Sequence, residues 1–139
     1  YLFTEAIINK KEIKIFNKGN LSRDFTYIDD IVEGVTKTIT NDSKNKLLNR
    51  VYNIGNNQPV KLKDFIKCIE NELNITAKKR LIDMQPGDVL QTWADVNKIE
   101  EDYDYRVRTK LNFGIKKFID WYKEYKHLNW VNSTIKDYN

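Results

Sequence analysis

The chain has 139 residues, which is the size of one ordinary domain. Apolar residues make up 40% of it and charged residues 32%, so it can bury a core beneath a strongly charged surface. The net charge is only +4, and the basic residues are scattered among 20 acids, whereas a nucleic-acid interface needs them clustered. We therefore predict no nucleic-acid partner, although the small positive excess suits an anionic small molecule.

The single cysteine and the single histidine exclude a disulfide framework and any ordinary Cys/His zinc site within this chain, so no metal is predicted. No stretch approaches the roughly 20 apolar residues of a membrane span, and no signal peptide is visible. We predict a cytoplasmic protein without a membrane partner. The chain opens at Tyr1 inside a helical pattern and without a Met, which indicates a fragment of a longer protein.

The first part of the chain alternates predicted helices with predicted strands. Apolar residues spaced three and four apart indicate helices, and alternating or β-branched runs indicate strands. In chain order we predict the end of a helix at 2–10, a strand at 13–16, a turn at 17–20 that allows positive φ, a strand at 25–28 and a helix to about residue 40. Asp29 or Asp30 can cap this last helix, and the helix dipole favours acids there.

The second part continues the alternation. We predict a polar loop at 41–49, a strand at 51–54 that stops at 55–57, a helix from Leu62, a strand at 76–82, a short helix capped by Asp95 and a last helix capped by Thr109. The helix from Leu62 has the clearest apolar face, formed by Leu62, Phe65, Ile66, Ile69 and Leu73.

Strands that alternate with helices define the α/β class. Residues 1–128 form the predicted folded region. Residues 129–139 have weak periodicity and are predicted to be a loosely ordered tail.

Arg23 opens the run Arg-Asp-Phe-Thr-Tyr-Ile-Asp-Asp-Ile-Val-Glu-Gly-Val and is the first candidate binding residue. A guanidinium is always charged, and its five donors form a planar fork that matches phosphate oxygens. Its position after a turn and before a strand suits the rim of a pocket. The alternative is a surface ion pair with Asp24 or Asp30, and spacing alone leaves both interpretations open.

Two further segments contain candidate binding residues. The predicted strand at Asn53 ends at Gly55, where a backbone can approach a ligand closely or the strand can simply stop. Asp88 follows the turn at Pro86 and Gly87. Its carboxylate can accept hydrogen bonds from the vicinal hydroxyls of a ribose, or it can serve only as an Asx-type turn residue.

Motifs for cofactor binding and catalysis are absent from the sequence. It has no Gly-x-Gly-x-x-Gly or Gly-x-x-Gly-x-x-Gly run, so it lacks a dinucleotide cradle of the Rossmann type. Tyr122 and Lys126 match the bare spacing Tyr-x-x-x-Lys. We reject them as catalytic because they lie in a terminal helix rich in Lys and Tyr, with Tyr122 on its apolar face. No catalytic residue is therefore predicted in this chain.

Four segments in order resemble the C-terminal part of UDP-glucuronate 4-epimerases, which are NAD-dependent enzymes of the extended short-chain dehydrogenase/reductase group. They are residues 23–35, 51–56, 85–95 and 114–122. The resemblance implies an α/β fold in which short strands alternate with helices, as in the substrate-binding part of that group. The N-terminal Rossmann domain would lie outside this chain, before Tyr1.

The resemblance also implies the residues that bind a UDP-sugar. Arg23 would contact the diphosphate, and Asp88 the ribose. The strand with Lys14 and Phe16 would lie along the uracil. Gln85, which stands where relatives often have Arg, would lie beside Asp88, and Asn53 would help to line the site.

The implied function is that of an isomerase in carbohydrate metabolism. The full-length protein would interconvert UDP-glucuronate and UDP-galacturonate, with NAD and the catalytic Tyr-x-x-x-Lys and Ser/Thr upstream of Tyr1. It would form a homodimer, and this chain alone would be inactive. The competing hypotheses are a nucleotide-sugar decarboxylase or dehydratase of the same fold, or a stand-alone, non-catalytic module that binds a sugar nucleotide.

Further positions depart from the pattern of the family, among them Val107, which stands where Pro is common. Asp104 stands where relatives usually have Gly before Tyr105, and Asp tolerates the left-handed conformation better than most residues. Lys61 replaces the usual Ser or Thr cap before the helix at Leu62.

Overall fold

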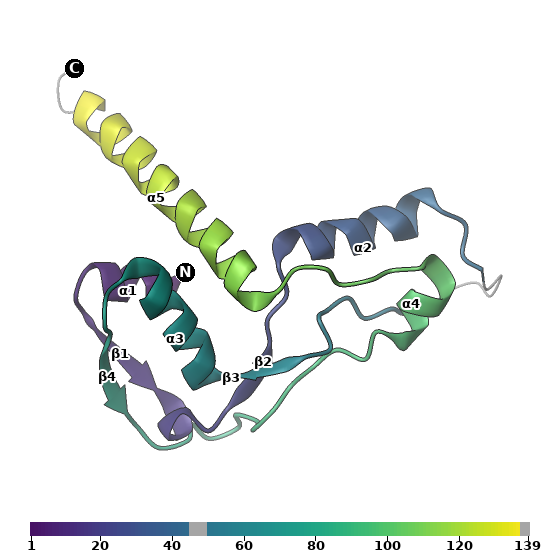
Figure 1. Ribbon diagram of the computed structural model, residues 1–139, viewed down its shortest axis with the longest axis horizontal. Coiled ribbons are helices and arrows are strands. Elements are labelled where there is room, and N and C mark those ends of the chain that lie inside the picture. The colour runs from purple at the N-terminus through teal and green to yellow at the C-terminus, as the bar shows by residue number, and fades with distance from the viewer. Residues whose placement is uncertain (45–49, 137–139) are drawn as a thin grey trace.

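The computed structural model describes the backbone of residues 1–44 and 50–136, and the side chains of that range as far as His127. The elements in chain order are α1 (Leu2–Ile8), β1 (Glu12–Ile15), the 3-10 turn η1 (Phe16–Gly19), β2 (Ser22–Asp24), α2 (Ile28–Thr40), β3 (Pro59–Lys61), α3 (Leu62–Leu73), β4 (Lys78–Leu81), α4 (Asn97–Tyr103) and α5 (Leu111–Lys136) (Figure 1). Short strands alternate with helices, so the predicted α/β class is confirmed.

The strands form two small sheets. β1 and β4 are parallel, with Ile15 opposite Leu81. β2 and β3 are antiparallel, with Ser22 opposite Lys61. The segment 90–92 runs along the other edge of β2, where the Ser22 N–H donates to the Leu90 carbonyl at 2.9 Å and the Thr92 N–H to the Ser22 carbonyl at 3.3 Å. β2 is therefore held on both edges by segments that are distant in sequence.

The main core lies between α1, β1, α3 and α5 (Figure 1). Its buried residues are Ile7, Ile13, Ile15, Ile66, Ile69, Ala77, Ile115 and Ile119. The apolar face predicted for the middle helix is confirmed, since α3 buries Ile66 and Ile69 while Leu62, Phe65 and Leu73 pack against the same cluster. A second, smaller core surrounds Val96, Ile99 and Tyr105 near α4.

The strand predicted at 25–28 is wrong. Pairing covers Ser22–Asp24 instead, and α2 already begins at Ile28. Asp24 lies opposite Pro59, which has no N–H to donate, so the ladder ends there. The ring of Phe25 then stacks on Phe65 of α3, with ring centroids 3.8 Å apart.

The predicted cap of α2 is also wrong. Tyr27 precedes the helix, and no side chain caps it. Asp30 is buried, and its carboxylate accepts hydrogen bonds from the backbone N–H groups of Arg108 and Thr109, at 3.1 and 3.3 Å. It therefore ties the first turn of α2 to the segment before α5.

No strand ladder forms at 51–54 within the described residues, although a strand was predicted there. The burial still alternates, with Tyr52 and Ile54 partly buried and Val51 and Asn53 exposed. The alternation gave the signal for a strand, but none of the described strands lies alongside to complete the ladder.

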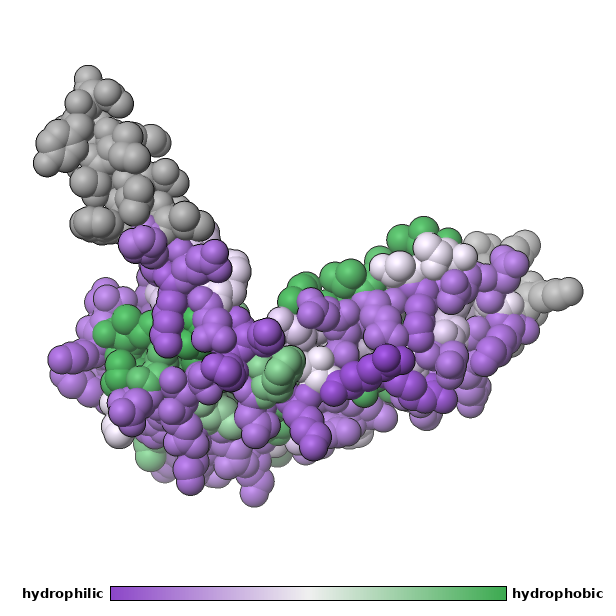
Figure 2. All heavy atoms as spheres, turned by 45° about the horizontal axis from the view of Figure 1, so that its top comes forward, coloured by the Kyte–Doolittle hydropathy of each residue, from purple (hydrophilic) through white to green (hydrophobic). Residues whose placement is uncertain are grey.

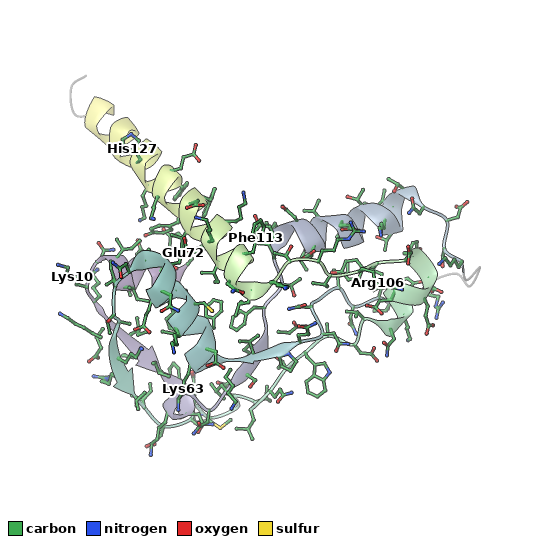
Figure 3. The ribbon with its side chains drawn as sticks, viewed as in Figure 1. Lys10, Lys63, Glu72, Arg106, Phe113 and His127 are labelled. Atoms are coloured by element: carbon green, nitrogen blue, oxygen red, sulfur yellow. The ribbon has the colours of Figure 1, made fainter. Side chains whose placement is uncertain are left out.

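Several local predictions hold. Asn17 and Gly19 have positive φ in the turn before β2, at 46° and 83°. The side chain of Lys63 from α3 lies over Gly19, where an added Cβ would come within 2.6 Å of the Lys63 Cε (Figure 3). Asp104 is left-handed, with φ 53° at the end of α4. Lys61 precedes α3 without a side-chain capping bond.

The last two helices begin close to the predicted positions. Asp95 Oδ1 accepts a hydrogen bond from the Asn97 N–H at the start of α4, at 3.1 Å. α5 begins at Leu111 and continues to Lys136, so the helix includes residues 129–136 of the predicted tail. Residues 45–49 of the predicted polar loop and 137–139 of the tail lie outside the described residues. Within the described part of the chain, no helix has the length and apolarity needed to cross a membrane.

Candidate functional site

Arg23 and Asp88, predicted to contact a diphosphate and a ribose, lie side by side. The Nη2 atom of Arg23 is 2.5 Å from Oδ1 of Asp88. Arg23 lies in the middle of β2, whereas Asp88 follows a turn in which its N–H donates to the Gln85 carbonyl at 3.1 Å. Their side chains are 28% and 27% exposed, so a ligand can reach the pair although it is partly shielded from water.

The geometry leaves both side chains able to bind a ligand. Arg23 Nη1 also donates to the Ser22 carbonyl, at 2.8 Å, which fixes the plane of the guanidinium. The remaining N–H groups of the fork can still bind oxygens of an anion. Asp88 Oδ1 accepts a second bond from the Val89 N–H at 3.0 Å, while Oδ2 accepts none among the described residues. That oxygen can accept hydrogen bonds from hydroxyl groups.

Arg23 therefore does form an ion pair, as one interpretation predicted, but its partner is neither Asp24 nor Asp30. The partner, Asp88, is the other candidate ligand-binding residue. A carboxylate beside the guanidinium orients it and also lowers the local positive potential. The pair suits a ligand that has both anionic oxygens and hydroxyl groups better than a free anion.

Lys14 and Phe16 lie near the segment that leads to Asp88. Lys14 is exposed on β1, opposite Arg80 of β4, and Phe16 begins η1 and is half-buried. The Lys18 N–H of η1 donates to the Ile82 carbonyl at 3.0 Å, which joins η1 to the chain just before Gln85. Figure 1 shows η1, the end of β4 and β2 gathered at one edge of the molecule.

Gln85 and Asn53 have different surroundings. Gln85 belongs to the same turn as Asp88, and its side chain is exposed. Asn53 is also exposed, but its Nδ2 donates to the Asp95 carbonyl at 3.2 Å, beside the second core. Among the described residues, no hydrogen bond or ion pair joins Asn53 to Arg23 or Asp88.

The pair Tyr122 and Lys126 is arranged for packing. Tyr122 is buried, and burial raises the pKa of its hydroxyl, with Lys126 partly opposing that effect. A general base works best with a pKa near the operating pH, so this shift is in the wrong direction. Lys126 Nζ is bound to Glu5 Oε1 at 2.7 Å. The lone His127 lies further along α5, on the part that projects from the rest of the molecule (Figure 3).

The described residues include neither a glycine-rich turn that leads into a helix nor a cluster of metal-ligating side chains. The glycines with positive φ, Gly19 and Gly87, precede β2 and the segment 90–92 rather than a helix. Acids occupy the first turns of α2, α3 and α4, where they would repel a pyrophosphate. No group of three or more His, Cys, Asp or Glu side chains in the described part of the chain is arranged to hold a metal.

An apolar hollow of about 640 Å³ lies between α1, α3, α5 and the segment before α2. Aromatic side chains line it, including Phe25, Tyr27, Phe65 and Trp121. No local sequence pattern predicts this hollow, because its walls come from four separate stretches of the chain.

Asp24 has a role that its place in the sequence does not indicate. The sequence suggests it only as an ion-pair partner of Arg23, yet its carboxylate accepts two backbone hydrogen bonds. The donors are Asn57 and Ala94, which lie 33 and 70 residues further along the chain. No local sequence signal identifies bonds over such separations.

The structure is thus an α/β fold with a partly exposed Arg23–Asp88 pair that leaves N–H donors and one carboxylate oxygen open. Residues 2–55 match the NAD dependent epimerase/dehydratase family. Protein CapI of Staphylococcus aureus is 42% identical over 139 residues, which cover 90% of this chain and 42% of CapI. UDP-glucuronate 4-epimerase 4 of Arabidopsis thaliana is 38% identical over 138 residues, covering 90% of this chain and 32% of that protein.

The fold agrees with a solved structure. The UDP-glucuronic acid 4-epimerase of Bacillus cereus, solved with UDP-glucuronic acid and NAD, superposes with a TM-score of 0.79 and 30% identity, covering 88% of this chain and 38% of that one. The chain is therefore similar to proteins of the NAD dependent epimerase/dehydratase family, with the family match itself over residues 2–55. It spans about 40% of the length of the curated relatives that it matches.

Proposed function

We propose that this chain is the UDP-sugar-binding, C-terminal part of an NAD-dependent nucleotide-sugar 4-epimerase. The full-length protein would interconvert UDP-glucuronate and UDP-galacturonate, and this chain alone would be inactive. The observation that carries the proposal is the partly exposed Arg23–Asp88 pair. The guanidinium of Arg23 keeps unused N–H donors, and Asp88 keeps one open acceptor oxygen. The names of the relatives, which include UDP-glucuronate 4-epimerases, support the choice of reaction.

The residues of this chain would bind and orient the nucleotide. Arg23 would bind the diphosphate through its unused N–H groups, and Asp88 Oδ2 would accept from the ribose hydroxyls. Lys14 and Phe16 would lie along the uracil, with Gln85 beside the ribose and Asn53 at the edge of the site. A nucleotide fixed in this way holds its sugar in one place, which lowers the entropy that the reaction must lose.

The cofactor and the acid–base residues would lie in polypeptide outside this chain, since the described residues show no glycine-rich turn that leads into a helix. NAD, when bound there, supplies the acceptor and donor of a hydride. A homodimer and a cytoplasmic location are part of the same proposal.

A second candidate is a different reaction on a nucleotide sugar. The name of the matching family includes dehydratases, which favours dehydration as the runner-up. Decarboxylation by the same fold ranks below dehydration. A stand-alone module that binds a sugar nucleotide without turning it over ranks last.

The test is product analysis with the full-length protein that contains this chain. Given UDP-glucuronate and NAD, it should form UDP-galacturonate with no loss of CO₂, while the isolated chain forms none. Loss of CO₂ would identify a decarboxylase, and a 4-keto-6-deoxy product from UDP-glucose would identify a dehydratase. Turnover by the isolated chain would contradict the proposed division of the protein.

A further inference from the structure

Asp24 is the last residue of β2, directly after Arg23. A single oxygen of its carboxylate, Oδ2, accepts hydrogen bonds from the backbone N–H groups of Asn57 and Ala94, each at 3.0 Å. These two donors belong to the two segments that flank β2. Asn57 precedes β3 on one edge, and Ala94 follows the segment 90–92 on the other. The Asp24 carboxylate is thus hydrogen-bonded to both of the segments that flank β2.

The packing around this carboxylate is tight. A Cβ added to Gly55 would lie 2.9 Å from Asp24 Oδ2 and 2.5 Å from the Cβ of Ala94, so only glycine fits there. The three segments therefore meet with no room for another side chain. A shift of one segment must move the other two.

The attachment at Ala94 matters for the candidate site. Asp88 and Ala94 lie on the same segment, and its described backbone bonds to β2 are those of Leu90 and Thr92 with Ser22. The bond from Ala94 to Asp24 fixes the far end of that segment. Without it, the described bonds between residues 88–94 and β2 would be those at Ser22 and the Arg23–Asp88 pair.

The two oxygens of this carboxylate are unequally paired. Its other oxygen, Oδ1, is buried and has no hydrogen-bond partner among the described residues. An unpaired buried acceptor costs free energy, yet an ionised carboxylate makes stronger bonds to backbone amides than a neutral amide does. At Asp24, Oδ2 therefore makes two strong hydrogen bonds, to Asn57 and Ala94, while Oδ1 stays unpaired among the described residues.

We propose that Asp24 is the positioning residue of the nucleotide site: it holds the segment 88–94 against β2, so that Asp88 stays paired with Arg23. This inference rests on the proposed function, because Arg23 and Asp88 are assigned to the nucleotide there. Asp24 acts through these two residues and need not touch the ligand.

The test uses the full-length protein with UDP as the probe. Asp24→Ala should weaken UDP binding by about tenfold in titration calorimetry, as expected for the loss of charge-assisted hydrogen bonds. It should raise KM for the UDP-sugar by a similar factor and leave kcat within about twofold, because the reacting end of the sugar is untouched. Asp24→Asn keeps the shape and one acceptor oxygen, so its effect should be intermediate.

Asp30 provides a matched control. It is also an aspartate that accepts two backbone bonds, from Arg108 and Thr109, but it ties α2 to the segment before α5. Asp30→Ala should lower the melting temperature as Asp24→Ala does, while leaving UDP affinity unchanged. Hydrogen exchange followed by mass spectrometry should show faster exchange over residues 88–94 in Asp24→Ala only.

Three outcomes would overturn the inference. Asp24→Ala could bind UDP as tightly as the wild type, it could leave the exchange of 88–94 unchanged, or Asp30→Ala could weaken UDP binding equally. Failure of the wild-type protein to bind UDP is a different result, since it contradicts the proposed function itself. Circular dichroism of each variant, with Asp24→Asn as the milder change, excludes loss of the fold as the cause.

Discussion

The value of Arg23 as a binding residue depends on the shape of its side chain as well as its charge. One face of the guanidinium fork is committed to Asp88 and the Ser22 carbonyl, which sets the direction of the remaining donors. A lysine at the same position would keep the charge but would offer a single point of contact on a flexible stem. A comparison of Arg with Lys at position 23 can therefore separate the effect of charge on ligand binding from the effect of side-chain geometry.

Arg23→Lys in the full-length protein should raise KM for the UDP-sugar by about tenfold with little change in kcat, because the fork is lost while the charge remains. Arg108→Lys is the control. Arg108 is 73% exposed and lies 3.9 Å from Glu33, so its substitution should leave both kinetic constants unchanged. Steady-state kinetics at several concentrations of the UDP-sugar measure the effect. Equal KM values for wild type and Arg23→Lys would remove Arg23 from the binding site.

At the scale of elements, the ends of helices depend both on local backbone conformation and on contacts with residues distant in sequence. α3 and α4 both end in left-handed residues, Asn74 and Asp104. Asp104 also has two tertiary contacts: its carbonyl accepts from Lys37 Nζ at 2.7 Å, and its carboxylate lies 3.6 Å from Arg106. The carbonyl contact does not depend on the side chain, so the side chain can be varied without losing it.

Two substitutions at Asp104 should have different effects on the stability of the protein. Asp104→Gly relieves the left-handed strain and loses only an exposed ion pair, so the melting temperature should stay level or rise by about 2 °C. Asp104→Ala loses the same ion pair and keeps a Cβ, so it should destabilise the protein by about 1 kcal/mol. Thermal unfolding of both variants measures the difference. A melting temperature for Asp104→Ala equal to or above that of Asp104→Gly would contradict this account.

The elements also show which parts of the fold can be predicted from sequence. The apolar face of α3 and the left-handed Asp104 follow from local periodicity and local backbone preference, and both are present. The end of β2 depends on Pro59 across the ladder, and the partners of Asp30 lie beside α5, so no local pattern identifies either. Side-chain chemistry made Arg23 and Asp88 candidates and the resemblance of ordered segments gave them their roles, but only the folded chain shows that they form a pair.

At the scale of the whole molecule, one face of α2 is not covered by the rest of this chain. Ile28, Val32, Val35 and Ile39 recur at helical spacing, and between 43% and 77% of each is exposed. Figure 2 shows hydrophobic side chains gathered along this helix. The opposite face of α2 is packed, since Gly34 and Asp30 are buried. The helix is thus amphipathic with its apolar face toward solvent, the reverse of what a surface helix requires.

We expect the rest of the full-length protein to cover this face, and the isolated 139-residue chain to be marginally stable and to self-associate. Val32→Lys with Ile39→Lys removes apolar surface and adds charge, so it should weaken self-association of the isolated chain by about tenfold or more. Thr36→Lys, on the same helix and also exposed, adds charge without removing apolar surface and should have a much smaller effect. Sedimentation velocity across a range of protein concentrations measures the association. A wild-type chain that sediments as a monomer and unfolds cooperatively would mean that the exposed face needs no partner.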